Sequence, residues 1–208
     1  MKRIAGLDLA SFRIAGAALA ALMLASACTT EPSAPAGPKA VSFEAQAPLR
    51  LDVASIAVDS RYQAPGRAPN IEHLYGVTPV SAARAWAASR LVGIGPRGTA
   101  VLTVLDGSVV SEDLPKKGGL TGIFGDQRDV RLTARLRARL AVDRPGERPG
   151  ELDQWSVDVE ASANRTVLES ASLNERDAAY GLLMQQLARE FDTALTAEIR
   201  RSMNAALR

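Results

Sequence analysis

The sequence contains a single cysteine, Cys28, and a single histidine, His73. One cysteine excludes an internal disulfide and a thiolate metal cluster. One histidine leaves no imidazole-rich metal site and makes a catalytic triad unavailable within the chain. The acidic residues are scattered, without the spacing of a calcium-binding loop or a zinc-protease helix. We therefore expect no metal and no cofactor, and we interpret His73 as a surface residue.

The N-terminus has the three-part pattern of an export signal. A basic opening ends at Arg13, an uncharged apolar run covers residues 14–24, and small residues precede Cys28. The run is shorter than the roughly 20 apolar residues that a membrane-spanning helix needs. The pattern therefore predicts a signal peptide over residues 1–27, with a single-pass anchor as the alternative.

The residues around the cysteine, Ala-Ser-Ala-Cys, resemble a lipobox, in which lipid is attached to the thiol and the chain is cut just before it. A lone thiol in an exported protein needs an explanation, and acylation of Cys28 provides one. The alternative is a plain signal peptide with an incidental cysteine. The residue after the cysteine is Thr29 and not aspartate. In lipoproteins of the enterobacterial type, this resembles a sorting signal for the outer membrane. We therefore predict a lipoprotein of the outer membrane that faces the periplasm.

The mature chain is balanced in charge. Removing residues 1–27 takes away three basic residues and one acidic residue, which leaves 22 of each. This balance gives no reason to expect nucleic acid as a partner. Residues 28–48 are rich in Pro, Ala and small polar residues without a structural period, so they are predicted to form a flexible tether. Residues 49–208 are long enough for one domain with its own core.

Alternation of apolar and polar residues predicts four strands in that domain. The first covers residues 49–62 with a β-bulge near Ala54, and the second covers residues 99–114 with an irregularity at Gly107. Residues 128–142 and 155–164 alternate regularly and are separated by a turn. These last two strands are therefore predicted to form a hairpin.

Two segments have helical spacing. One begins at Thr78-Pro79, a cap followed by a first-turn proline, and ends at Gly93. The other begins at Ser172, three residues before Glu175 in a capping box, and extends to Leu207. The order β-α-β-β-β-α predicts a two-layer α+β sandwich, in which two helices cover one face of a four-stranded, mostly antiparallel sheet.

Arginines line the polar face of the strand over residues 128–142. Because inner and outer faces must match across the hairpin, the predicted register brings each arginine opposite one residue of the last strand. The pairs are Arg139–Asp158, Arg137–Glu160, Arg135–Ser162 and Arg131–Thr166. The first two pairs satisfy their arginines locally. Arg131 and Arg135 are left as a candidate anion patch.

The segment LPKKGGLTGIFG, residues 114–125, is the most unusual in the chain. It is not a phosphate loop, because its lysines precede its glycines. Its basic and apolar side chains suit a surface that is both apolar and anionic, such as lipid headgroups or lipopolysaccharide. These candidate contact residues are Lys116, Lys117, Leu120, Ile123 and Phe124. The alternative is a hairpin loop that folds Phe124 back onto the sheet.

The plan of anchor, tether, strand, helix, three strands and C-terminal helix resembles the lipopolysaccharide-assembly lipoproteins that plug the outer-membrane export barrel. The passage NRTVLESASLNERDAAYGLLMQQLAREFDTAL, from Asn164 into the last helix, has a similar rhythm. The Gly-rich loop and the extended C-terminal helix depart from that family. Auxiliary lipoproteins of lipid-transporting ABC systems share a related plan. The resemblance implies a barrel, a transporter or a glycolipid as partner.

These observations predict a non-catalytic accessory or scaffold lipoprotein in outer-membrane assembly or in lipid or lipopolysaccharide transport. Its expected partners are the membrane, through Cys28, and an envelope protein or glycolipid. The alternatives are an envelope hydrolase with an unrecognised carboxylate site and an auxiliary lipoprotein of an ABC-type transporter. A carboxylate pair converging in a deep pocket would favour the hydrolase. A shallow, open sheet face would favour the scaffold.

Overall fold

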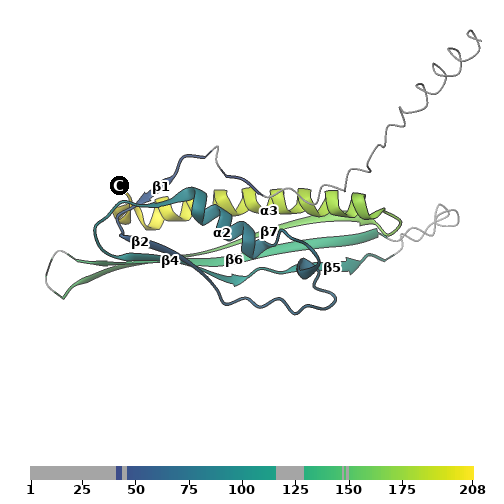
Figure 1. The fold of residues 1–208 in the computed structure, drawn as a ribbon, viewed down its shortest axis with the longest axis horizontal. Helices are drawn as coiled ribbons and strands as arrows, with labels where there is room; N and C mark the ends of the chain where they lie inside the picture. Colours follow the sequence, from purple (N-terminus) through teal and green to yellow (C-terminus); the bar gives the residue numbers. More distant parts are fainter. Residues whose placement is uncertain (1–40, 44–45, 116–128, 147, 149) are drawn as a thin grey trace, which may run out of the picture. The chain divides into compact units, whose positions relative to one another are not determined.

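The structure, a computed structural model, describes residues 41–43, 46–115, 129–146, 148 and 150–208 (Figure 1). These residues belong to one compact unit, Ala36–Arg208. The predicted signal peptide and Cys28 lie outside the described residues. Within the predicted tether, Phe43 is only 6% exposed and packs in the core. An isolated apolar residue among prolines and alanines carries no period, so its burial could not be read from the sequence.

The main sheet has five strands: β2 (Ser55–Ser60), β4 (Thr99–Asp106), β5 (Val109–Asp113), β6 (Asp129–Pro145) and β7 (Leu152–Leu168). β7 pairs with β6 along its whole length, and β4 and β5 lie end to end along the other edge of β6. All these pairs are antiparallel. β2 pairs with β4 in parallel, which makes the sheet mixed.

The prediction of four strands is corrected to five because the expected second strand is broken at Gly107. A Cβ atom at Gly107 would lie 2.7 Å from the Val80 Cγ2 atom and 3.3 Å from the Tyr62 ring. A side chain at Gly107 would therefore force Val80 to shift, at the point where the helical layer and the preceding loop approach the strand. The predicted irregularity at this position is confirmed, and it divides β4 from β5.

The prediction of one bulged strand over residues 49–62 is wrong. β1 (Leu49–Leu51) pairs in parallel with β3 (Leu91–Gly93) in a separate small sheet, and Leu51 also forms an antiparallel bridge with Leu207. Between β1 and β2, the backbone of Val53 and Ala54 bonds to residues 95 and 98. The change of phase in the pattern marks a crossing between two sheets.

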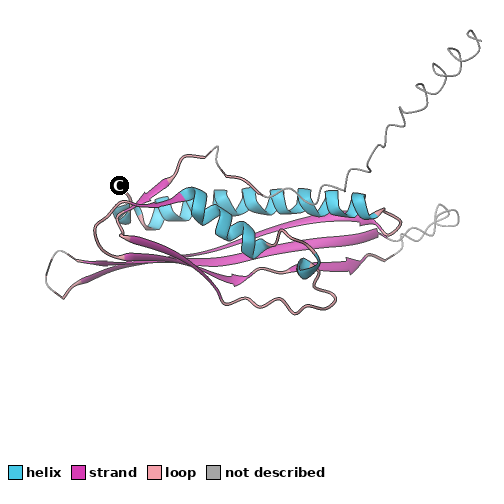
Figure 2. Cartoon of the chain, viewed as in Figure 1, coloured by secondary structure: helices cyan, strands magenta, loops and turns pink. Residues whose placement is uncertain are grey.

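Two helices cover one face of the main sheet, as predicted (Figure 2). α2 (Pro79–Arg90) begins with Thr78 as its cap, and α3 (Leu173–Ser202) begins with the predicted capping box of Ser172 and Glu175. Both helices end earlier than expected. α2 stops at Arg90 because Leu91 enters β3, and α3 is followed by the short helix η4 (Asn204–Ala206).

The core lies between the helices and the inner face of β6 and β7. Every second residue of β6 from Leu132 to Val142 is no more than 6% exposed, which confirms the predicted alternation over this stretch: Leu132, Ala134, Leu136, Ala138, Leu140 and Val142. Small side chains on both strands, among them Ala138 and Ala161, let α3 approach the sheet closely. Trp86 of α2 meets Phe191 of α3 edge to face, with ring centroids 5.6 Å apart.

The loop between β2 and α2 is held against the break in the sheet by Glu72, in the short helix η2 (Glu72–Leu74). The Tyr62 hydroxyl donates to Glu72 Oε1 (2.7 Å), and the Val109 backbone N–H donates to Oε2 (3.0 Å). Burial acts to raise the pKa of this carboxyl, but these hydrogen bonds hold it below its ordinary value of 4.5. The folded state therefore stabilises the ionised form of the Glu72 carboxyl.

A Glu72→Gln variant tests this role. At pH 7 it is expected to lower the free energy of unfolding by about 1–3 kcal/mol, because charge-assisted bonds to Tyr62 and Val109 are weakened. A carboxyl with a depressed folded pKa stabilises above its unfolded pKa and loses that effect as pH falls through its folded pKa. The difference in melting temperature between wild type and variant should therefore shrink below pH 4.5. Glu112→Gln, at an exposed position of β5, is the control. A difference that stays constant with pH would contradict the assignment.

Candidate functional site

The structure describes only part of the predicted site. Cys28 and all five candidate contact residues, Lys116, Lys117, Leu120, Ile123 and Phe124, lie outside the described residues. Both residues of the candidate anion patch are described. Arg131 and Arg135 are exposed on β6, on the side of the sheet that faces away from the helices. His73 is exposed in η2.

The hairpin of β6 and β7 has the register that the sequence predicts. Arg139 faces Asp158 and Arg137 faces Glu160. Two hydrogen bonds of 2.8 Å join the guanidinium of Arg139 to the carboxylate of Asp158. This pairing lowers the pKa of Asp158 and raises that of Arg139. The prediction that this arginine is satisfied across the strands is confirmed.

The other two arginines face neutral residues of β7, as predicted. Arg131 faces Thr166 and Arg135 faces Ser162. On the other edge of β6, however, Glu112 of β5 is the register partner of Arg131. A carboxylate at this position competes with any external anion. Anion binding by Arg131 and Arg135 therefore stays a prediction. Of the two, only Arg131 has an acidic register partner.

The side of β4, β6 and β7 that faces away from the helices forms an outer face that no described helix or strand covers (Figure 2). Most exposed side chains along β6 and β7 are polar or charged, except for Leu152 and Leu168 at the two ends of β7, and both strands are 17 residues long. The result is a long, open face of the sheet.

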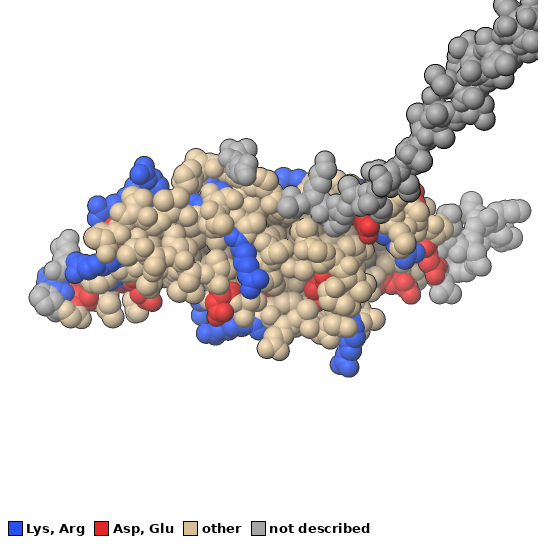
Figure 3. Space-filling view, viewed as in Figure 1, with Lys and Arg blue, Asp and Glu red and all other residues tan. Residues whose placement is uncertain are grey.

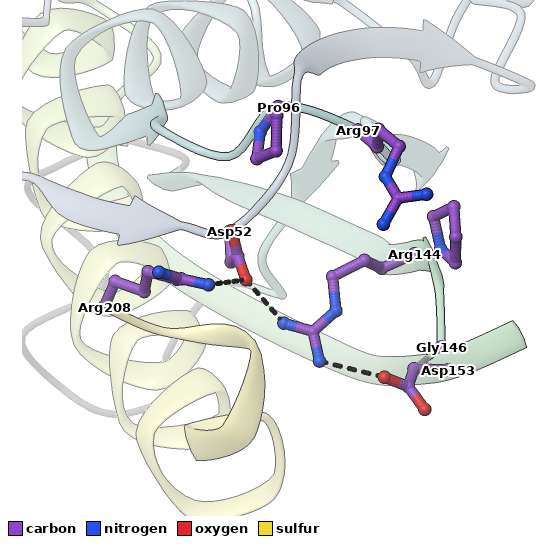
Figure 4. Close-up of a pocket in the computed structure, with 8 residues that line it drawn as sticks. Asp52, Pro96, Arg97, Arg144, Gly146, Asp153 and Arg208 are labelled. Atoms are coloured by element: carbon purple, nitrogen blue, oxygen red, sulfur yellow. Dashed lines mark hydrogen bonds and ion pairs between the residues drawn. The ribbon is translucent and has the colours of Figure 1, made fainter. Parts of the chain in front are cut away.

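A polar pocket of about 230 Å³ lies where β1, the end of β6 and the C-terminus meet (Figure 4). Arg144 crosses this pocket: its Nη1 atom lies 2.7 Å from Asp52 Oδ2, and its Nη2 atom lies 2.9 Å from Asp153 Oδ2. Arg208, the last residue, reaches the same oxygen of Asp52 at 2.7 Å. Arg97 points into the pocket from the opposite side. This cluster leaves no signal in the sequence, because its residues lie far apart in the chain.

Both carboxylates of the polar pocket are thus engaged by arginine. The hydrogen bond from Arg208, with a smaller contribution from Arg144, holds the pKa of Asp52 below its ordinary value of 3.8 despite its burial. A general acid needs a carboxyl that stays protonated near neutral pH, which requires a raised pKa. The cluster therefore fits a structural role, in which it holds Arg208 against the end of β1 and β6, better than it fits acid catalysis.

An apolar groove of about 150 Å³ lies at the opposite end of β6, between η2 with its flanking residues, the strand ends and the start of α3. It is lined by Ile71, Leu74, Tyr75, Ser111, Val130, Leu132, Val167, Leu168 and Arg176. Leu74 is 68% exposed and Leu168 is 46% exposed. Tyr75 is fixed in the wall by stacking on Tyr180 of α3, with ring centroids 3.6 Å apart. The groove leaves no signal in the sequence, since its walls come from four separate segments.

Within the described residues, no helix is long and apolar enough to cross a membrane. The same part of the chain contains no group of three or more His, Cys, Asp or Glu side chains placed to hold a metal ion.

No protein-family description matches the chain, and no curated protein matches it. Among solved structures, it is similar to a minor lipoprotein from Acinetobacter baumannii, with 12% identity and a TM-score of 0.40 over 73% of this chain and 96% of that chain. It is also similar to the rare lipoprotein B from Shewanella oneidensis, with 12% identity and a TM-score of 0.33 over 71% of this chain and 98% of that chain. Both similarities concern the path of the chain, and neither assigns a function.

Proposed function

We propose that the protein is a lipid-anchored, non-catalytic adaptor of the cell envelope, an accessory component in outer-membrane assembly or in lipid or lipopolysaccharide transport. The observation that carries the proposal is the outer face, which no described helix or strand covers, while the helices cover the other side of the sheet. Such a surface suits contact with a barrel, a transporter or a glycolipid. The lipobox at Cys28 supports placement at a membrane.

The rival function is an envelope hydrolase, and the polar pocket is where it would have to act. A hydrolytic pair needs one carboxyl to donate a proton and the other to act as base or nucleophile. Asp52 and Asp153 instead share the guanidinium of Arg144. This arrangement supports the adaptor over the hydrolase.

Complementation of a deletion strain tests the proposal, with uptake of a large apolar dye as the measure of the outer-membrane barrier. The double variant Arg131→Glu/Arg135→Glu is expected to leave the barrier defective, because it reverses the charge of the candidate anion patch on the outer face. Thermal unfolding should change little, since both side chains are exposed. Arg148→Glu, an exposed position in the turn between β6 and β7, is the matched control and should restore the barrier.

A second variant separates the adaptor from the hydrolase. Asp153→Asn removes one carboxylate of the polar pocket while keeping its shape, and it should restore the barrier if the protein is an adaptor. Loss of function in this variant, with the folded protein present at normal level, would favour the hydrolase and contradict the proposal.

A further inference from the structure

β7 is an edge strand of the main sheet along its whole length. It pairs with β6 over all 17 residues without a shift in register, and no described strand pairs with its other edge. An edge strand presents a row of backbone N–H and C=O groups that lack a partner in the sheet.

The hydrogen bonds of β6 show which backbone groups of β7 point to this free edge. The Arg135 N–H donates to the Ser108 carbonyl at 2.9 Å, so Arg135 directs its backbone toward β4 and β5. Successive residues of an antiparallel strand direct their backbone groups to opposite edges. Even-numbered residues of β6 therefore bond to their odd-numbered partners on β7. The open edge of β7 consists of the backbone groups of its even-numbered residues: Gln154, Ser156, Asp158, Glu160, Ser162, Asn164 and Thr166.

The other edges of the sheet are covered or short. The loop before η2 bonds to β5, because the Ser111 N–H donates to the Pro69 carbonyl at 2.9 Å. β2 is only six residues long. Proline, lysine and inward-pointing charges commonly block pairing at an edge, but residues 154–164 contain no proline or lysine, and their inward side chains are apolar. The described domain therefore neither covers nor blocks the open edge of β7.

The chemistry of the open edge specifies its ligand. Its donors and acceptors repeat about every 7 Å, the length of two strand residues, and another extended backbone has the same repeat. On the face seen in Figure 3, basic and acidic side chains are interspersed without a broad patch of one sign, so charge alone selects no ligand there.

We infer that the open edge of β7 binds an extended segment of a partner protein, which joins the main sheet as a further strand. The inference rests on the proposed adaptor function for the existence of such a partner. Asp158 and Glu160 lie on the outer face of β7. The partner segment should therefore place basic or hydroxyl side chains on that face.

Neither the chain itself nor a second copy fits this edge as well. Residues 28–40 contain three prolines, which cannot donate to a ladder, and residues 116–128 contain four glycines, which disfavour a strand. Two antiparallel copies of β7 in full overlap would set Glu160 opposite Glu160 of the second copy, and like charges directly opposite are destabilising.

The peptide Gly-Thr-Val-Lys-Val-Lys-Val-Thr-Gly tests the inference, together with two N-methylated forms. One form is methylated at the three valine amides, and the other at the two lysine amides and the second threonine amide. Each carries the same neutral dye, and fluorescence anisotropy measures binding to the full-length chain in nanodiscs of uncharged phospholipid. A docked strand turns only alternate amides toward β7. One form should therefore bind like the parent, and the other at least about tenfold more weakly.

Residue-resolved hydrogen exchange locates the binding. In the free chain, the amides of Asp158, Glu160 and Ser162 should exchange fast, whereas those of Val159 and Ala161 should exchange slowly because they bond to β6. The parent peptide should slow the three fast amides at least about tenfold and leave the other two unchanged.

A pair of variants connects the edge to function. Ser162→Pro removes one donor from the open edge and leaves the bonds to β6 in place, so it should weaken the peptide at least about tenfold. Ser162→Thr keeps the donor and should bind like wild type. In the complementation experiment, Ser162→Pro should leave the barrier defective, and Ser162→Thr should restore it.

Three results would overturn the inference: both methylated forms bind like the parent, the three edge amides are already slow in the free chain, or folded Ser162→Pro restores the barrier. Slow edge amides in a chain that sediments as a dimer would assign the edge to a second copy, and in a monomer to the chain itself. Arg131→Glu/Arg135→Glu leaves every backbone donor of β7 in place, so the outer face and the open edge can fail separately.

Discussion

Replacing Asp192 with alanine is expected to lower the free energy of unfolding by about 3–5 kcal/mol, because it leaves a buried arginine without its counter-ion. Asp192 Oδ1 accepts from Arg90 Nε at 2.8 Å and from Trp86 Nε1 at 2.7 Å. Arg90 is only 3% exposed, and its Nη1 atom has no hydrogen-bond partner among the described residues. The cluster joins α2 to α3, so the melting temperature should fall by about 10 °C or more.

Two further variants give this prediction its controls. Asp158→Ala removes an aspartate–arginine pair of the same 2.8 Å separation, but both partners are 54% exposed, so its effect on the melting temperature should be far smaller. Arg90→Met/Asp192→Leu replaces the buried pair with apolar side chains and should recover much of the stability that Asp192→Ala loses. Equal losses for Asp192→Ala and Asp158→Ala would show that burial of the pair is unimportant.

Replacing Cys28 with serine is expected to abolish membrane attachment of the mature chain, because lipid is added to the thiol and serine has none. The variant should accumulate as an uncleaved precursor or as a soluble periplasmic form. Cell fractionation and the intact mass of the purified protein measure the two outcomes. Ser26→Ala, in the same motif, should leave the acylated and cleaved form intact. A Cys28→Ser chain that matures and partitions with membranes as before would show that the lipoprotein prediction is wrong.

The hairpin of β6 and β7 shows how much a sequence can determine when one face of a strand is buried. Alternation is strict in both strands, so a shift by one residue would turn every apolar side chain toward solvent. The turn length then leaves one register, and the predicted pairs Arg139–Asp158 and Arg137–Glu160 are observed. The caps of the two helices, at Thr78 and Ser172, were predictable for a similar reason, because a side-chain cap acts within three residues of itself.

The first strand and the helix ends were not predictable in this way. β1 and β2 both alternate, and the change of phase between them fits a β-bulge as well as it fits a crossing from one sheet to another at residues 52–54. Leu91 fits the apolar stripe of a helix equally well as it fits β3, and pairing with Leu49 of the distant β1 decides between them. Tertiary pairing overrides local propensity wherever a segment satisfies two patterns.

By itself, the sequence determined the class of the fold, the register of its longest hairpin, the caps of its helices and the break at Gly107, all of which depend on interactions between near neighbours or on strict alternation. Only the tertiary structure decided the sites. Asp52, Arg144 and Arg208 come from three distant segments, as do the walls of the apolar groove and the pair of Arg90 and Asp192. Such contacts leave no spacing in the chain, because they form only when the core has brought distant strands and helices together.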